Sequence, residues 1–138
     1  MQTITIQTAQ KTQVLRVTDQ LAELVRDVND GLAFLSVPHT TAALILCEDD
    51  PELRDDLVKV AQKILAPLRP FKHIRKNNPN AEAHILSALA GTSLVIAVEN
   101  GAFDLGTYQN ILLLEMDGPK SRDIRCKVIK SHQSDPSD

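Results

Sequence analysis

The spacing of apolar residues predicts short strands that alternate with about three helices. Residues 3–9 and 12–17 are rich in Thr, Ile and Val, which predicts two strands joined by a tight turn. From Asp19 the apolar positions recur at i, i+3, i+4 and i+7, as in an amphipathic helix that should end at residues 29–31. Further strands are expected at residues 32–37, 42–47, 92–98, 107–116 and 122–130.

Two later helices carry capping signals. Asp50 is the expected N-cap of the second helix and Pro51 its first residue, where a missing N–H costs nothing. Its buried stripe is expected at Leu53, Leu57, Val60, Ala61 and Ile64. Asn80 should cap a third helix at residues 81–90, and Gly91 follows its end. Residues 66–80 contain three prolines and three asparagines without a period, which predicts a loop.

Three of the expected strands are apolar throughout, which predicts burial on both of their faces. They read LAFL at 32–35, AALILC at 42–47 and ILLL at 111–114. Three modest helices cover one side of a mixed sheet, so the remaining sheet surface needs another cover. We therefore expect a homo-oligomer that buries it.

Length and composition indicate one globular domain. The chain has 138 residues, enough for one hydrophobic core and too few for two. We expect the domain to span residues 1–130 and the polar residues 131–138 to form a frayed tail. Cys47 and Cys126 both fall in apolar runs, which suits free buried thiols, and a disulfide between them stays open as the alternative.

Charge and hydropathy exclude two classes of partner. The net charge of −3 and the scarcity of aromatic residues argue against a nucleic-acid binder. No apolar segment approaches about 18 residues, and the N-terminus lacks a signal pattern. We therefore expect a cytoplasmic protein that does not enter a membrane.

Three histidines are candidate metal ligands. His39 lies at the start of a strand, His73 in the long loop and His84 in the third helix. Three neutral imidazoles on one ion, with one position free for water, would make a catalytic zinc site. The alternative is structural, since His84 adjoins an apolar line and a carbonyl could satisfy it.

Glu48 also has two interpretations. It precedes the second helix, whose positive end favours a carboxylate, and it could instead be a general base or orient a histidine. His39 and Glu48 bracket one strand and would be roughly 30 Å apart if it stayed straight. Either the chain bends between them or a neighbouring subunit supplies the second group.

Polar residues near the C-terminal strands are candidate anion ligands. Gly101 and Gly106 flank a turn, after which Thr107 and Gln109 present polar groups, although a plain hairpin explains the same pattern. Arg122 shares strand parity with apolar neighbours and should face the interior at the strand's mouth, a good position for an anion ligand.

Three strings in order, HTTAALILCED, NPNAEAHILSALAGTSLVIAV and GAFDLGTYQNILLLEMDGPKSR, resemble the YjbQ family, also called the secondary thiamine-phosphate synthase family. The resemblance covers residues 2–130, and all three histidines fall on family positions. Departures from the family pattern occur at Cys47, Ile74, Tyr108 and Lys120, where the family has Asn, Asp, Trp and Arg. Lys120 would grip a phosphate less well than an arginine.

The resemblance implies an α+β domain with a β-sandwich or barrel-like mixed sheet, assembled as a homotrimer, with a divalent metal at the histidines. It also implies thiamine-phosphate synthase activity, which joins a pyrimidine diphosphate to a thiazole phosphate with release of pyrophosphate.

The leading hypothesis is a metal-dependent enzyme acting on a small phosphorylated molecule, either a synthase-like transferase or a hydrolase. His39, His73 and His84 would hold the ion, which we expect to be zinc because Mg²⁺ prefers oxygen ligands. Glu48 and His39 are the expected catalytic residues, and the anion would be received by Thr107, Gln109, Lys120 and Arg122. The rival hypothesis is a non-enzymatic trimer that binds a metabolite or a metal.

Overall fold

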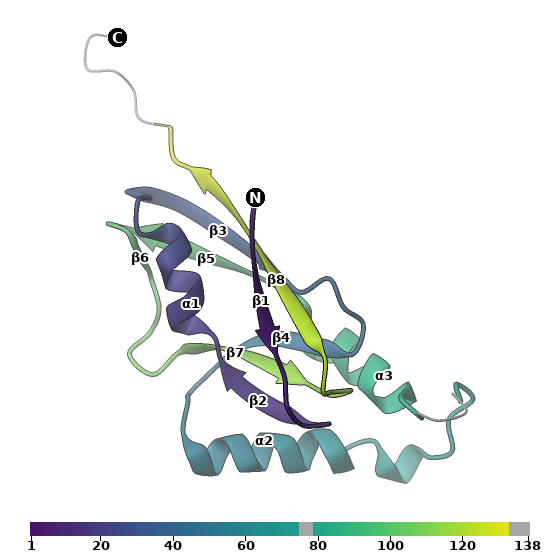
Figure 1. The fold of residues 1–138 in the computed structure, drawn as a ribbon. Helices are drawn as coiled ribbons and strands as arrows, with labels where there is room; N and C mark the ends of the chain where they lie inside the picture. The colour runs from purple at the N-terminus through teal and green to yellow at the C-terminus, as the bar shows by residue number, and fades with distance from the viewer. Residues whose placement is uncertain (75–78, 133–138) are drawn as a thin grey trace, which may run out of the picture.

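A computed structural model of the chain describes residues 1–74 and 79–132 and shows two antiparallel sheets (Figure 1). The five-stranded sheet has the order β1-β8-β3-β5-β6, and the three-stranded sheet has the order β2-β7-β4. The strands are β1 Gln2–Gln7, β2 Gln13–Arg16, β3 Asp30–Ser36, β4 Ala42–Cys47, β5 Ser93–Glu99, β6 Ala102–Phe103, β7 Asn110–Glu115 and β8 Ser121–Lys130. The expectation of a mixed sheet is wrong, because every strand pairing in the described residues is antiparallel.

The helices confirm the α+β class. They are α1 Thr18–Ala22, α2 Pro51–Lys63 and α3 Ala81–Ala90, with short 3-10 helices at Glu23–Val25 and Ala66–Leu68. The predicted cap of α2 is confirmed, since the Asp50 carboxylate accepts a hydrogen bond from the Leu53 N–H at 2.9 Å. Within residues 1–74 and 79–132, no helix is both long and apolar enough to cross a bilayer.

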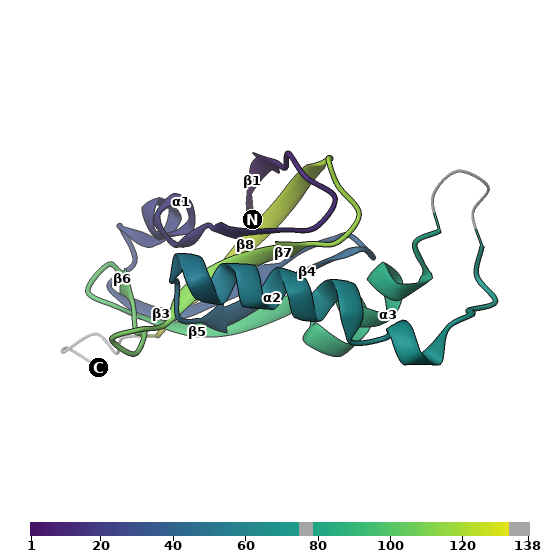
Figure 2. The same cartoon turned by 90° about the horizontal axis from the view of Figure 1, so that it is seen from below.

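Strands β4 and β7 are buried on both faces within a single chain. One face of their sheet packs against the five-stranded sheet and α1 through residues that include Leu44, Ile111 and Leu113. The other face is covered by α2 and α3 through Ala43 and Leu112 (Figure 2). The prediction of two-sided burial is therefore confirmed for these two strands, and one subunit supplies both covers.

Strand β3 behaves differently, because only one of its faces is buried. Its residues alternate between exposed and buried, and Leu32 and Phe34 remain 46% and 42% exposed. The register places Leu32 opposite Ile129 and Phe34 opposite Val95, and these neighbours are each 61% exposed. We call Leu32, Phe34, Val95 and Ile129 the outer apolar face. One chain buries only one face of β3, so the predicted burial of its second face depends on the predicted oligomer.

The predicted hairpin of the first two strands is also wrong. Strand β1 pairs with β8 and β2 pairs with β7, so the two strands belong to different sheets. The chain changes sheet at Thr8, whose N–H donates to the Lys120 carbonyl while the Gly118 N–H donates to the Lys11 carbonyl. These bonds run residues 8–11 alongside residues 118–120, at a corner that both sheets share.

The expected buried stripe of α2 is only partly covered. No residue of α2 is fully buried, and Val60 and Ile64 are 51% and 55% exposed. The helix touches its sheet through Leu57 and Val58, so the C-terminal part of the stripe faces outward.

Two further expectations concern the cysteines and the tail. Cys47 and Cys126 are free thiols, which confirms the interpretation without a disulfide. The expected frayed tail falls mainly on residues 133–138, which lie outside the described residues.

Candidate functional site

A polar pocket of about 520 Å³ lies where β4 begins and β7 ends. The antiparallel register puts Ala42 opposite Glu115, so the segments before β4 and after β7 leave the sheet at the same end. The start of β8 and the first turn of α3 complete the wall. The pocket is lined by Pro38, His39, Thr40, Thr41, Asn80, His84, Asp117, Lys120 and Arg122.

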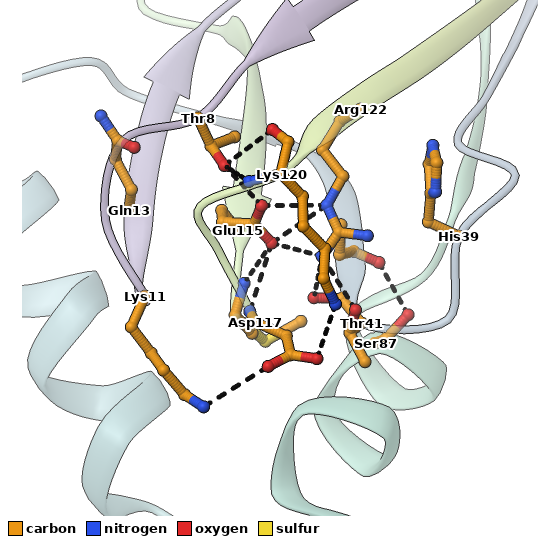
Figure 3. A network of polar contacts seen from close by, with 12 residues as sticks. Thr8, Lys11, Gln13, His39, Thr41, Ser87, Glu115, Asp117, Lys120 and Arg122 are labelled. Atoms are coloured by element: carbon orange, nitrogen blue, oxygen red, sulfur yellow. Dashed lines mark hydrogen bonds and ion pairs between the residues drawn. The ribbon is translucent and has the colours of Figure 1, made fainter. Parts of the chain in front are cut away.

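A buried ion pair between Glu115 and Arg122 forms the base of this site (Figure 3). Their side chains are 0% and 3% exposed. The Arg122 Nε donates to both Glu115 oxygens at 2.9 and 3.1 Å, and its Nη2 donates to Glu115 Oε2 at 2.5 Å and to Thr41 Oγ1 at 2.8 Å. The pair is held in one geometry, because both ends of the guanidinium edge are bonded.

Further donors fix the charge of Glu115. Its carboxylate also accepts from Thr8 Oγ1 at 2.7 Å and from the backbone N–H groups of Met116 and Asp117 at 3.0 and 3.2 Å. Burial acts to raise the pKa of Glu115, but the hydrogen bonds from Arg122, Thr8 and the Asp117 N–H outweigh it. The pKa therefore lies below its ordinary value, and Glu115 stays ionised.

Asp117 gathers a second set of polar groups. Its Oδ2 accepts from Lys120 Nζ at 2.8 Å and from Asn80 Nδ2 at 3.1 Å, and its Oδ1 accepts from Lys11 Nζ at 3.4 Å. Asn80 was expected to cap α3, but its side chain makes no cap bond. Asn80 does occupy the predicted N-cap position, but its amide joins Asp117 and His73 and does not bond the helix backbone.

The cluster brings cations and carboxylates together. Three cations, Lys11, Lys120 and Arg122, surround two carboxylates, Glu115 and Asp117. Arg122 Nη1 has no hydrogen-bond partner among the described residues, although every buried side-chain nitrogen or oxygen there has one. Nη1 is therefore open to the pocket, on the side of His39 (Figure 3).

His39 is held by the backbone of β8. Its Nε2 accepts a hydrogen bond from the Asp123 N–H at 2.9 Å. Burial, and then the neighbouring Arg122 charge, lowers the pKa of this histidine. The ring is therefore neutral near pH 7.

His73 and His84 lie together, and His84 also lines the pocket that contains His39. Their rings meet edge to face with centroids 5.1 Å apart, and His73 Nε2 is 3.1 Å from Asn80 Oδ1. Across residues 1–74 and 79–132, no three histidine, cysteine or acidic side chains gather closely enough to hold a metal ion. The residues that are described do not fit the three-histidine centre, which stays a prediction from sequence.

The other candidate residues, Glu48, Thr107 and Gln109, lie at the opposite end of the three-stranded sheet. Cys47 at the end of β4 pairs with Asn110 at the start of β7, a whole strand away from the pocket. Glu48 is exposed, and Gln109 Oε1 accepts from the Gly106 N–H at 2.8 Å within its own loop. Strand β4 does not bend back, so Glu48 and His39 lie at opposite ends of it within one subunit.

Several residues of the cluster escaped prediction as functional. They are Thr8, Lys11, Thr41, Asn80, Glu115 and Asp117. Two of them carried a signal, because Glu115 directly follows the apolar run 111–114 and Asp117 is a second acidic residue two positions later. A carboxylate that ends a fully buried strand needs a cation or several donors nearby.

The chain is a small α+β protein in which two packed antiparallel sheets present a polar pocket at one end. A family model described as "UPF0047 protein YjbQ-like" matches residues 2–131. The chain belongs to this family.

Three relatives illustrate how far the similarity extends. A UPF0047 protein of Archaeoglobus fulgidus is 37% identical over 126 residues, which cover 91% of this chain and 98% of that protein. The crystal structure of a hypothetical protein from Aeropyrum pernix K1 has a TM-score of 0.87 at 36% identity, with 94% of this chain and 98% of that chain covered. The crystal structure of a YjbQ/UPF0047 family protein from Clostridium acetobutylicum has a TM-score of 0.86 at 32% identity, with 94% of this chain and 100% of that chain covered.

Proposed function

We propose that this protein is an enzyme acting on a small phosphorylated metabolite whose phosphate binds in the pocket beside Lys120 and Arg122. The observation that carries the proposal is the unpaired Nη1 of Arg122 on a pocket wall that also presents Lys120. A phosphate supplies oxygen acceptors for both of these cations.

The two cations would act differently. Arg122 is fixed by Glu115 and Thr41, so it presents Nη1 without reorganising when the ligand arrives. The Lys120 side chain is 45% exposed and can swing from Asp117 to a phosphate oxygen as a mobile point charge. The Thr40 hydroxyl on the same wall would add a further donor.

The positions of the two cations favour a reaction in which a phosphate or pyrophosphate group leaves with negative charge. Lys120 and Arg122 would stabilise the negative charge that develops on a leaving phosphate or pyrophosphate. This suits hydrolysis of a phosphate ester, and it also suits displacement of pyrophosphate as in thiamine-phosphate synthesis. His84 lines the pocket and would be the group that exchanges a proton with the substrate. No step is assigned to a metal ion, because no three possible ligand side chains gather among the described residues.

We further propose that the protein assembles as a homotrimer in the cytoplasm. The outer apolar face exposes four large apolar side chains on adjacent strands, and a second copy of the chain would cover them. A neighbouring subunit could then bring Glu48, Thr107 and Gln109 to the pocket, which one chain cannot do.

Turnover tests the proposal. Purified protein is incubated with a panel of phosphate monoesters and with the pyrimidine diphosphate and thiazole phosphate precursors of thiamine phosphate, and released phosphate or pyrophosphate is measured. We expect product from the wild type, loss of turnover in Lys120→Met, and wild-type turnover in the control Lys130→Met, an exposed lysine at the far end of β8. Ligand-induced stabilisation without product from any compound would instead favour the rival, a non-enzymatic binding protein.

A further inference from the structure

The His39 ring takes part in the hydrogen-bond ladder of the five-stranded sheet at the point where β3 stops. Ser36, the last residue of β3, lies opposite Arg125. In this antiparallel register Asp123, two residues before Arg125 in β8, would lie opposite Pro38. Because proline has no N–H, the regular ladder of hydrogen bonds ends there. His39 Nε2 accepts this N–H at 2.9 Å.

This bond determines which ring nitrogen carries the proton. A backbone N–H can only donate, so Nε2 must offer its lone pair. In a neutral imidazole the other nitrogen then bears the hydrogen, so His39 is the Nδ1–H tautomer. Nδ1 has no protein partner among the described residues, and no buried side-chain nitrogen there is unpaired, so Nδ1–H is open to the pocket.

The same bond conflicts with a metal-ligand role. A neutral histidine that binds a metal through one nitrogen carries its proton on the other and donates it to an acceptor. His39 would have to break its bond to Asp123 to free Nε2, which would leave that N–H unpaired, or lose its last proton to free Nδ1.

We infer that His39 is a hydrogen-bond donor to the bound phosphate through Nδ1–H, and not a metal ligand. With Arg122 Nη1 and Lys120 Nζ it makes a third donor on the pocket wall. The inference rests on the proposed function for the identity of the anion. It also assigns His39 a binding role in place of the metal-ligand and catalytic roles expected from sequence.

His73 supplies an internal reference for the test. Asn80 must turn its NH₂ toward the Asp117 carboxylate, so its Oδ1 faces His73 and requires a proton on Nε2. Long-range ¹H–¹⁵N NMR spectra of histidine-labelled wild-type protein should therefore show His39 as the Nδ1–H tautomer and His73 as the Nε2–H tautomer. The His39 signals should not change when equimolar zinc is added. A proton on His39 Nε2, or zinc-dependent shifts of its ring nitrogens, would overturn the inference.

Two substitutions separate the donor from the backbone acceptor. In His39→Asn the amide nitrogen takes the place of Nδ1, but no acceptor reaches Asp123. In His39→Gln the amide oxygen reaches the place of Nε2, but the Nδ1 donor is lost. We expect His39→Asn to bind pyrophosphate within about threefold of the wild type and His39→Gln to bind about tenfold or more weakly. Thermal stability should follow the opposite order, with His39→Gln the more stable variant.

The outcomes separate this inference from the proposed function. If calorimetry shows no pyrophosphate binding by the wild type, the phosphate site and the donor role fall together. If the wild type binds and His39→Asn loses as much affinity as His39→Gln, the assignment of the Nδ1 donor alone is wrong. Equal stability of the two variants would contradict the Asp123 contact.

Discussion

The buried Glu115–Arg122 pair offers the sharpest energetic prediction. Replacing Glu115 with alanine removes the acceptor of three contacts from Arg122, one from Thr8 and two from backbone N–H groups. The guanidinium, 3% exposed, would keep only its bonds to Thr41. Removing one partner of a buried pair costs about 3–5 kcal/mol, since the remaining charge is left without compensation.

That loss is a large part of the stability of a small domain, which is about 5–15 kcal/mol in total. We expect the midpoint of thermal unfolding to fall by on the order of 10 °C in Glu115→Ala. Circular dichroism monitors both thermal unfolding and urea unfolding, and the free energies from urea are extrapolated to water. Glu99→Ala is the matched control, because Glu99 is an exposed glutamate at the end of β5, and it should change stability by less than about 0.5 kcal/mol.

A double variant tests the physical reason. Replacing both charged partners, as in Glu115→Gln with Arg122→Met, removes the charges and their desolvation cost together and keeps a side-chain oxygen for the Met116 and Asp117 N–H groups, so most of the stability should return. The reasoning is refuted if Glu115→Ala loses less than about 1 kcal/mol. It is also refuted if the double variant is as unstable as the single one.

Three further predictions follow from the same contacts and from the outer apolar face. The pKa values of Glu115 and His39 are both lower in the folded chain than in the unfolded chain. As the pH falls, the unfolded chain therefore takes up these protons first, and the free energy of unfolding should decrease. For His39 this decrease should begin at about the ordinary His pKa of 6.5, and for Glu115 below the ordinary Glu pKa of 4.5. Denaturation curves at a series of pH values should show both steps, and the lower step should shrink in Glu115→Gln. In sedimentation at micromolar concentration the wild type should be a trimer and Phe34→Asp a monomer, because the charge would be buried at the interface; a wild-type monomer contradicts this. Mass spectrometry of the purified protein should find no metal whose retention depends on His39, and stoichiometric zinc lost in His39→Ala would reverse that conclusion.

The sequence predicted most elements because their signals are local. Asp50 and Pro51 marked the start of α2 through a cap that forms within one turn. The pairing of β1 and β2 was missed, because period-2 patterns specify a strand and not its partner. The long-range bonds of Thr8 to Glu115 and Lys120 decide that pairing.

The candidate site was predicted in part for a related reason. His39, Lys120 and Arg122 were all expected to be functional, and the structure brings them to one pocket. Glu48 and Gln109 were grouped with them by residue type, but the register of β4 with β7 places them at the other end of the sheet. Asp117 was missed, since its importance depends on side chains from three separate segments.

Calorimetric titration with pyrophosphate is the measurement that tests the phosphate site most directly, with wild type, Lys120→Met and Lys130→Met compared at low ionic strength. We expect binding by the wild type and by Lys130→Met, and an affinity about 10- to 100-fold lower in Lys120→Met, because one charge-assisted hydrogen bond is lost. Binding should also weaken as salt is added. Equal affinities in all three proteins, or no binding by the wild type, would contradict the central claim that this pocket receives a phosphate group.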